Sequence, residues 1–174
     1  MSNYKDVYIG IGANLGDPLA TILQAIQLMQ SLPEVSAFRI SKFYQTSPIS
    51  DLPQPDFVNA VCYFKTLGTP QKLFEKLQHI EIKLGKQPKN KNEPRPIDLD
   101  ILFFGKENYS TSNLEIPHPR WTERLFVLKP LSDLTSDIIL NDTAFHIPTL
   151  ISQFPYAHQE VVEIADFNYT SSSF

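Results

Sequence analysis

The first 104 residues alternate between strand-like and helix-like spacing of hydrophobic positions. Runs of apolar, β-branched and aromatic residues predict strands over residues 7–12, 37–46, 57–66 and 96–104. Between them, two stretches repeat hydrophobic residues at three- and four-residue intervals, from Leu19 to about Leu32 and from Leu73 to Leu84, which is typical of helices. The order β-α-β-β-α-β predicts a ferredoxin-like α+β fold, an antiparallel sheet with two helices on one face.

Both predicted helices have strong start signals. Asp17-Pro18 and Thr69-Pro70 each place an oxygen acceptor at the N-cap and proline at the first helical position. Gly85 is expected to end the second helix. Residues 47–56 and 87–94 are polar and rich in proline, and they predict two long loops. Long loops in compact domains are often binding loops or lids, although a tolerated surface insertion is the alternative for either one.

The chain beyond residue 104 has a weaker pattern. Residues 114–116 and 137–140 are expected to form short strands, and residues 123–134 to contain a helix interrupted near Pro130. The serine- and threonine-rich tail from residue 166 is expected to be frayed. We therefore predict a single domain over residues 1–165 that includes a C-terminal extension of the core, followed by a frayed tail over residues 166–174.

Composition and charge narrow the possible functions. Hydrophobic residues make up 42% and charged residues 20%, which is ordinary for a globular protein. Fifteen Lys+Arg against nineteen Asp+Glu give a net charge of -4, which disfavours a protein that mainly binds nucleic acid. The single cysteine, Cys62, excludes an internal disulfide and is expected to be buried. With no long apolar run, no signal pattern and no oligomer seam, we expect a cytoplasmic monomer that does not contact a membrane.

The strongest chemical signal is the segment Pro94-Arg95-Pro96-Ile97-Asp98-Leu99-Asp100. Because side chains alternate along a strand, Asp98 and Asp100 are expected to share one face, ~7 Å apart. A carboxylate pair in an apolar strand favours a hard cation such as Mg²⁺, which also bridges to phosphate. Arg95 can donate forked hydrogen bonds to phosphate oxygens. The alternative is a sheet face open to water on which both aspartates are merely solvated.

A basic cluster precedes this strand in an otherwise acidic chain. Lys86, Lys89 and Lys91 lie within or beside the predicted loop of residues 87–94. A solvated charged loop is the ordinary interpretation of such a cluster. Next to a carboxylate pair, however, the lysines favour a flap that grips a polyphosphate.

Asn59 is a polar residue in the middle of an apolar predicted strand. A buried amide needs hydrogen-bond partners, so Asn59 could read the edge of a heterocycle or simply pin the backbone. Phe57, two residues earlier, is expected on the same face. Gly10 and Gly12 of the first strand and Gly16 of the turn after it do not have the spacing of a dinucleotide-binding loop, and they favour close packing and the turn instead.

Taken in order, several short motifs resemble the 6-hydroxymethyl-7,8-dihydropterin pyrophosphokinase family. The match runs from Tyr8 to about Leu134. Its carriers are Gly12-Ala13-Asn14-Leu15-Gly16, Phe43-Tyr44-Gln45-Thr46-Ser47-Pro48, Phe57-Val58-Asn59-Ala60, Ile80-Glu81 with Gly85, the Asp98/Asp100 segment, Pro117-His118-Pro119-Arg120 and Arg124 with Phe126-Val127-Leu128. The resemblance implies transfer of the β,γ-pyrophosphoryl unit of ATP to the hydroxymethyl oxygen of the pterin, with release of AMP, in folate biosynthesis.

The resemblance also implies roles for individual residues. Asp98 and Asp100 would bind two Mg²⁺ ions and, with Arg95 and Lys86, would form the catalytic set. The pterin would be bound by Thr46, Ile49, Phe57, Asn59 and Phe126, with the two phenylalanines on either side of the ring. ATP would be bound by Gln78, Glu81, Lys86, Arg95, Ile101, His118 and Arg124. No protein nucleophile is needed, since phosphoryl-type transfer depends on positioning and charge neutralisation.

The chain departs from the family in the second loop. The family often has Gly-Arg-x-Arg where this chain has Gly85-Lys86-Gln87-Pro88, and Glu93 stands where glycine usually precedes Pro-Arg. A lysine carries a point charge without the fork of an arginine, so the grip on ATP is expected to differ. Two other classes share the fold order: an RNA-binding RRM module, which would need a basic, aromatic third strand, and a small-molecule-binding regulatory domain without a metal pair.

Overall fold

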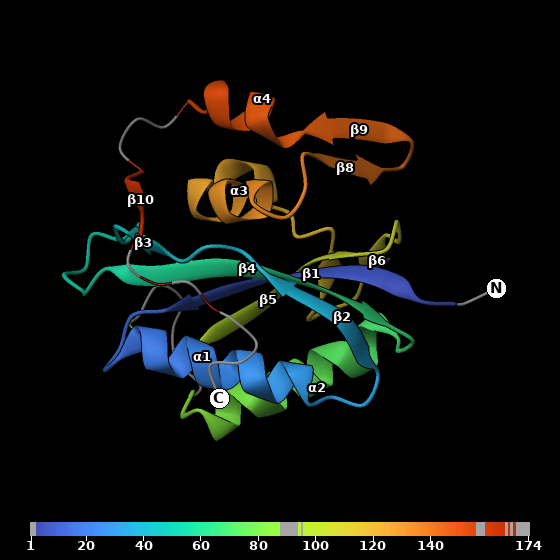
Figure 1. Ribbon diagram of the computed structural model, residues 1–174, viewed down its shortest axis with the longest axis horizontal. Helices are drawn as coiled ribbons and strands as arrows, with labels where there is room; N and C mark the ends of the chain where they lie inside the picture. Colours follow the sequence, from blue (N-terminus) through green and yellow to red (C-terminus); the bar gives the residue numbers. More distant parts are fainter. Residues whose placement is uncertain are drawn as a thin grey trace.

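A central antiparallel sheet carries helical layers on both faces (Figure 1). In the computed structural model, residues 3–87, 94, 96–155, 159–165, 167 and 169 are described. The sheet has the order β10-β3-β4-β1-β5, and β2 also pairs with β4. These strands are β1 (Lys5–Ala13), β2 (Val35–Ile40), β3 (Tyr44–Thr46), β4 (Phe57–Thr66), β5 (Asp98–Phe104) and β10 (Val161–Glu163). The predicted ferredoxin-like core is confirmed, because β1, β4 and β5 form its antiparallel centre.

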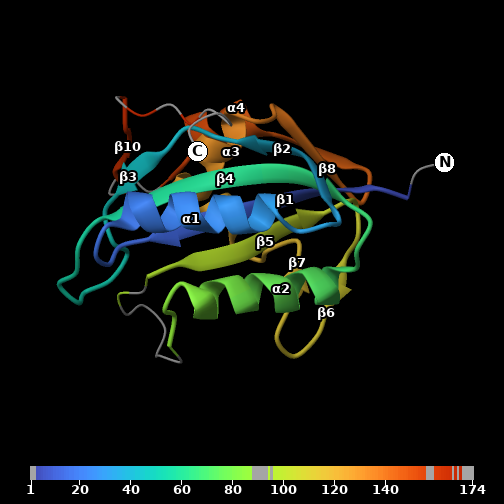
Figure 2. The ribbon, with the colours of Figure 1, turned by 60° about the horizontal axis from the view of Figure 1, so that its bottom comes forward.

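The helices α1 (Pro18–Gln30) and α2 (Pro70–Lys83) cover one face of the sheet (Figures 1 and 2). Both begin where their caps predict. The Asp17 carboxylate accepts a hydrogen bond from the Ala20 N–H, and the Thr69 hydroxyl accepts one from the Lys72 N–H. Gly85 follows α2 with φ of +99°, the left-handed conformation that favours glycine at a helix end.

The strand predicted over residues 37–46 is wrong in one respect, because the structure divides it into β2 and β3. Both pieces lie along the same edge of β4, with Ile40 opposite Cys62 and Tyr44 opposite Asn59. Ser41 stands between them. Its N–H donates to the Val61 carbonyl and its hydroxyl accepts from the Val61 N–H, each at 2.9 Å. A side chain thus replaces one backbone acceptor of the ladder, and regular pairing is interrupted there.

The opposite face of the sheet is covered as well, which the sequence pattern did not predict. The second layer consists of α3 (Leu125–Ser132), α4 (Ile147–Ser152) and the hairpin of β8 (Asp137–Leu140) and β9 (Thr143–His146), preceded by the short hairpin of β6 (Tyr109–Ser110) and β7 (Glu115–Ile116) and the 3₁₀ turn η1 (Trp121–Glu123). Its hydrophobic cluster contains Val61, Leu102, Phe103, Trp121 and Leu128 with their neighbours. The interruption predicted near Pro130 is wrong, since Pro130 lies inside α3 and is buried.

The sheet supplies side chains to two separate hydrophobic clusters. Ala60 and Cys62 of β4 belong to the cluster beneath α1 and α2, whereas Val61 between them belongs to the cluster beneath α3. Cys62 is fully buried, as predicted. In the part of the chain that the structure describes, no helix is both long and apolar enough to cross a bilayer.

Two residues of the C-terminal tail are described, and both pack on the core. The Phe167 ring lies 5.1 Å from the Phe43 ring, centroid to centroid. The Tyr169 hydroxyl donates a hydrogen bond to the Gln30 side chain at 3.0 Å. The rest of the tail predicted to be frayed, residues 166, 168 and 170–174, lies outside the described residues.

Candidate active site

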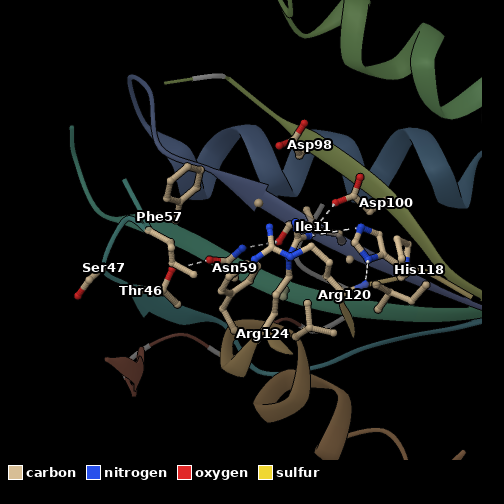
Figure 3. A pocket seen from close by; sticks show the side chains of 18 of the residues that line it. Ile11, Thr46, Ser47, Phe57, Asn59, Asp98, Asp100, His118, Arg120 and Arg124 are labelled. Carbon is tan, nitrogen blue, oxygen red and sulfur yellow. Dashed lines mark hydrogen bonds and ion pairs between the residues drawn. The ribbon is translucent and has the colours of Figure 1, made fainter. Parts of the chain in front are cut away.

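A cavity of about 660 Å³ opens where β1, β4 and β5 meet the loop of residues 47–56 and the segment of residues 118–127 (Figure 3). It brings together most of the residues singled out in the sequence. Those that line it are Thr46, Ile49, Phe57, Asn59, Lys86, Asp98, Asp100, His118, Arg124 and Phe126. They come from the strands β3, β4 and β5, the helix α3 and the connections between elements, so the fold assembles one site from the separate motifs.

The two aspartates lie on the same face of β5, as strand alternation predicts, and both line the cavity. Each has a cation nearby. The Lys86 ammonium lies 2.7 Å from Asp98 Oδ1, and the Arg124 guanidinium lies 4.0 Å from Asp100 Oδ2. The Asp98 side chain is 27% exposed and that of Asp100 is 47% exposed. The alternative of two merely solvated aspartates is therefore wrong for Asp98, which is ion-paired and mostly covered.

Glu81 lies behind the carboxylate pair rather than in the cavity. One of its oxygens accepts the Leu99 N–H at 2.7 Å, and the other lies 3.1 Å from the Lys86 ammonium. Burial raises the pKa of Glu81, opposed by these two donors. Burial lowers the pKa of Lys86, because it disfavours the charged form. The hydrogen bonds and negative charges of Asp98 and Glu81 outweigh this effect, so the pKa of Lys86 lies above its usual value. Lys86 is thus a firmly charged link between α2 and β5.

Asn59 is held in one amide orientation by its neighbours. Its Nδ2 donates to the Ile11 carbonyl at 3.3 Å, and because a carbonyl only accepts, the amide nitrogen must point there. The Thr46 hydroxyl then donates to Asn59 Oδ1 at 2.7 Å. A Cβ atom at Gly12 would lie 2.8 Å from Asn59 Nδ2, so the glycine opposite Asn59 makes room for the amide. Among the hydrogen bonds of the described residues, these two leave one N–H and one oxygen lone pair of Asn59 for a ligand.

His118 is neutral at physiological pH. Burial, followed by the positive charges of Arg124 and Arg120, lowers the pKa of His118 to about 4. Its Nδ1 accepts the Arg120 N–H at 3.1 Å, which places the proton of the neutral ring on Nε2. The Arg124 guanidinium lies 3.4 Å from that Nε2. This end of the cavity therefore presents two adjacent donors and one full positive charge, which suits an anionic ligand.

The donor set fits Mg²⁺ held jointly with a phosphate ligand. Within the described residues, no group of three histidine, cysteine or acidic side chains is placed to hold a metal ion. The cavity instead offers the two carboxylates of Asp98 and Asp100. Mg²⁺ is commonly bound by one or two carboxylates plus substrate phosphates and water, so two oxygen donors suffice.

Three predicted nucleotide-binding residues lie outside the cavity lining. Gln78 is exposed on α2, Glu81 is buried behind β5, and Ile101 belongs to the core beneath α1 and α2. Their assignment to ATP stays a prediction. Arg95 lies outside the described residues, and so do residues 88–93 of the predicted flap, which include Lys89 and Lys91.

Several residues that line the cavity had no ligand-binding role in the prediction from the sequence, although Gly12, Ser47 and Arg120 belong to the motifs that carry the resemblance. They include Gly12, Ser47, Gln54, Leu102 and Arg120. Gln54 had no signal beyond its place in a proline-rich loop. Gly12 had one, because a glycine in the middle of an apolar strand often marks a close approach of another group.

The sequence of this chain is similar to those of known proteins. The model of the family "7,8-dihydro-6-hydroxymethylpterin-pyrophosphokinase (HPPK)" matches residues 8–136. A 2-amino-4-hydroxy-6-hydroxymethyldihydropteridine pyrophosphokinase of Pseudomonas aeruginosa is 37% identical over 150 residues, which cover 86% of this chain and 92% of that protein. The Bacillus subtilis protein of the same name is 39% identical over 131 residues, which cover 75% of this chain and 78% of that protein.

Longer proteins contain a similar region. A folic acid synthesis protein of Pneumocystis carinii is 37% identical over 167 residues, which cover 96% of this chain but only 22% of that protein. Among solved structures, wild-type HPPK-DHPS of Plasmodium falciparum with pteroate matches with a TM-score of 0.68 at 14% sequence identity, over 86% of this chain and 42% of that chain. At that identity the likeness concerns the fold alone.

Proposed function

Because this chain belongs to the 7,8-dihydro-6-hydroxymethylpterin-pyrophosphokinase (HPPK) family, we propose that it transfers pyrophosphate from ATP to 6-hydroxymethyl-7,8-dihydropterin. The hydroxymethyl oxygen attacks the β-phosphorus of ATP and loses its proton. The bond from that phosphorus to the α,β-bridging oxygen breaks, and AMP leaves with the bridging oxygen. The observation that carries the proposal is one cavity lined at one end by a carboxylate pair and at the other by an oriented buried amide.

The end of the cavity around Asn59 suits a flat heterocycle. The second N–H of the Asn59 amide and the second lone pair of its oxygen form a donor–acceptor pair that can match the edge of a pterin. Phe57 and Phe126 both line the cavity, and Ile49 adds an apolar side chain from the loop of residues 47–56. We propose that these residues, with Thr46, bind the pterin and that the two phenylalanines lie on its opposite faces.

The other end of the cavity suits the polyphosphate of ATP. We propose that Arg124, the Nε2–H of His118 and Lys86 donate to its oxygens, together with Arg95, and that Gln78, Glu81 and Ile101 belong to the nucleotide site. Asp98 and Asp100 would hold Mg²⁺, two ions by our proposal, which when bound neutralises charge on the phosphates. Since Lys86 is paired with Asp98, we propose that it exchanges this carboxylate for a phosphate oxygen when ATP binds.

The alternative of an RRM-like RNA-binding module is not supported. Such a module stacks bases on an open sheet face. Here the face opposite α1 and α2 carries α3, α4 and the β8–β9 hairpin (Figure 1). The chain also carries a net charge of -4, which opposes polyanion binding.

We further propose that residues 1–165 act as one domain, as a monomer in the cytoplasm. Several of the large hydrophobic side chains that are exposed among the described residues lie on different parts of the fold: Leu67 follows β4, Ile82 is on α2, Ile139 on β8 and Val162 on β10. Light scattering during size-exclusion chromatography is expected to give a mass near 19.8 kDa. A concentration-independent mass of twice that value would contradict the monomer.

The function is tested by following AMP release from ATP in the presence of Mg²⁺ and the pterin. The wild-type protein is expected to form AMP only when both substrates are present. Asp98→Asn and Asp100→Asn each remove one carboxylate charge while keeping side-chain shape, and turnover is expected to fall ~100-fold or more. Asp51→Asn, on the exposed loop, is the matched control and should be fully active. Absence of AMP from the folded wild-type protein, or wild-type turnover by both Asp98→Asn and Asp100→Asn, would contradict the proposal.

A further inference from the structure

Arg124 is the only residue between two helical segments, the end of η1 at Glu123 and the start of α3 at Leu125. Its backbone is extended, with φ of -123° and ψ of 103°. Its carbonyl accepts the N–H groups of Val127 and Leu128 at 2.9 and 3.0 Å and so begins α3. No side chain at the N-cap position of α3 makes the usual capping hydrogen bond, since Arg124 itself occupies that position. The orientation of Arg124 therefore depends on how the two helix ends are held.

A single side chain from the C-terminal part of the chain holds both ends. Gln159 Oε1 accepts the Leu125 N–H at 3.0 Å, and Gln159 Nε2 donates to the Glu123 carbonyl at 3.2 Å. Helix ends leave such backbone groups without partners inside the helix. One amide thus satisfies an N–H of α3 and a carbonyl of η1 on either side of Arg124. Gln159 lies beyond residues 8–136, which the family model matches.

The side chain of Arg124, the residue between these two bonded backbone groups, faces the charged end of the cavity. The Arg124 guanidinium lies 4.0 Å from Asp100, 3.4 Å from His118 Nε2 and 5.6 Å from the centroid of the Phe126 ring (Figure 3). The Arg124 side chain is 22% exposed, and this partial burial lowers its pKa. We propose that Gln159 is a positioning residue that aims Arg124 at the phosphates of the nucleotide. This inference rests on the proposed function.

The segment that carries Gln159 is fixed independently of its side chain. The Glu160 carbonyl accepts the Ser47 N–H at 3.3 Å, Val161 pairs with Thr46, and the Val161 carbonyl accepts the Lys129 ammonium at 3.0 Å. Truncation of Gln159 should therefore leave β10 in place and remove only the two bonds beside Arg124. A substitution of Gln159 therefore tests its side-chain hydrogen bonds without disturbing the backbone pairing of β10.

The test compares Gln159→Ala with Gln153→Ala, an equal truncation at an exposed position at the end of α4. Gln159→Ala is expected to lower kcat/KM for ATP ~10-fold, because small displacements of a charged group cost that much or more in oriented transfer. Its KM for the pterin should stay within ~2-fold, since Asn59 and its partners are untouched. Gln153→Ala should leave both quantities unchanged. Loss of activity through unfolding is checked by far-UV circular dichroism.

A double-mutant cycle separates positioning from general stabilisation. In an Arg124→Ala background, Gln159→Ala is expected to change kcat/KM less than ~2-fold, because the group that it positions is already missing. Binding of a non-hydrolysable ATP analogue, measured by calorimetry, gives the same cycle without turnover. Wild-type behaviour of Gln159→Ala, or an equal loss in both backgrounds, would overturn the inference. If the wild-type protein released no AMP, the proposed function would fail. The double-mutant cycle measured by binding of the ATP analogue would still test whether Gln159 acts through Arg124.

Discussion

At the scale of single residues, side chains of the cavity owe their orientation to groups that are themselves buried. Thr46 and Asn59 are 3% and 6% exposed, and the Ile11 carbonyl fixes which end of the Asn59 amide is the donor. The selectivity of such a site is built into the protein, because an amide that cannot flip presents one donor–acceptor order only.

Thr46→Val tests this orientation without altering Asn59. The valine keeps the volume of threonine but removes the hydroxyl that donates to Asn59 Oδ1. The buried oxygen then lacks that partner, and pterin binding is expected to weaken by about 1–3 kcal/mol, with Asn59→Leu weakening it at least as much. Binding of an ATP analogue should be unaffected in both variants, as measured by calorimetry. The exposed Thr143→Val is the control, and an equal loss for both ligands would argue against a pterin role.

His118 predicts a specific dependence of stability on pH. Its pKa is about 4 in the folded protein against about 6.5 in an unfolded chain, so the unfolded chain binds the proton first as pH falls. The stability that the neutral imidazole contributes is fully present above pH ~6.5 and is lost as pH falls toward 4. His118→Gln lacks this titration. The difference in free energy of unfolding between wild type and His118→Gln is therefore expected to shrink from pH 7 to pH 4.5 in urea titrations. A constant difference would show that His118 titrates normally.

At the scale of elements, the loop of residues 47–56 is tied to the turn after β1. Asn14 is 2% exposed, and its Nδ2 lies 2.9 Å from Gln54 Oε1 and 3.1 Å from the Pro55 carbonyl. The same loop brings Ser47, Ile49 and Gln54 to the cavity. A single buried amide thus connects the first turn of the chain to one wall of the site.

Asn14→Ala is expected to release this loop. The two acceptors lose their donor, and the free energy of unfolding should fall by about 1–3 kcal/mol. Amide exchange in residues 49–54 should accelerate, and pterin affinity should fall, because the wall of the cavity is less ordered. Asn113→Ala, at an exposed position far along the chain, provides the comparison. Unchanged exchange in the loop would mean that its prolines alone determine its conformation.

Local signals in the sequence predict most helices and strands. The features that they do not predict, such as the break between β2 and β3, depend on contacts between residues far apart in the chain. The Asp17 and Thr69 caps fixed the helix starts because a cap depends only on residues three positions apart. The break at Ser41 could not be foreseen, because it depends on hydrogen bonds to Val61 twenty residues away. Pro130 by itself predicts an interruption of the helix, but burial of α3 against the sheet compensates for its missing N–H.

The same division applies to the candidate site. Strand alternation was enough to put Asp98 and Asp100 on one face. Two other features could not be predicted from the hydrophobic pattern: the ion pair of Lys86 with Asp98 and the hydrogen bond of Gln159 beside Arg124. Both depend on tertiary contacts between residues far apart in the chain.

At the scale of the whole molecule, one sheet supplies side chains to two hydrophobic layers, one on each of its faces. Trp121 is the only tryptophan of the chain and lies in the second layer, with ring centroids 5.0 Å from Phe103 of β5 and 5.4 Å from Phe145 of β9. Ile26 lies on α1 in the first layer and is fully buried. Since adjacent residues of β4 belong to opposite layers, loss of either layer exposes apolar surface of the sheet.

The two layers are therefore expected to unfold together. Ile26→Ala should destabilise the protein by about 2–5 kcal/mol through the cavity it leaves. Its urea midpoint should shift equally whether unfolding is followed by far-UV circular dichroism or by Trp121 fluorescence, although Trp121 lies on the other side of the sheet, because a single cooperative transition moves all probes alike. Leu67→Ala, at a position 56% exposed, should shift neither curve appreciably. A Trp121 transition that stayed at its wild-type midpoint while the dichroism moved would show that the layer carrying Arg124 and Phe126 is an independent folding unit.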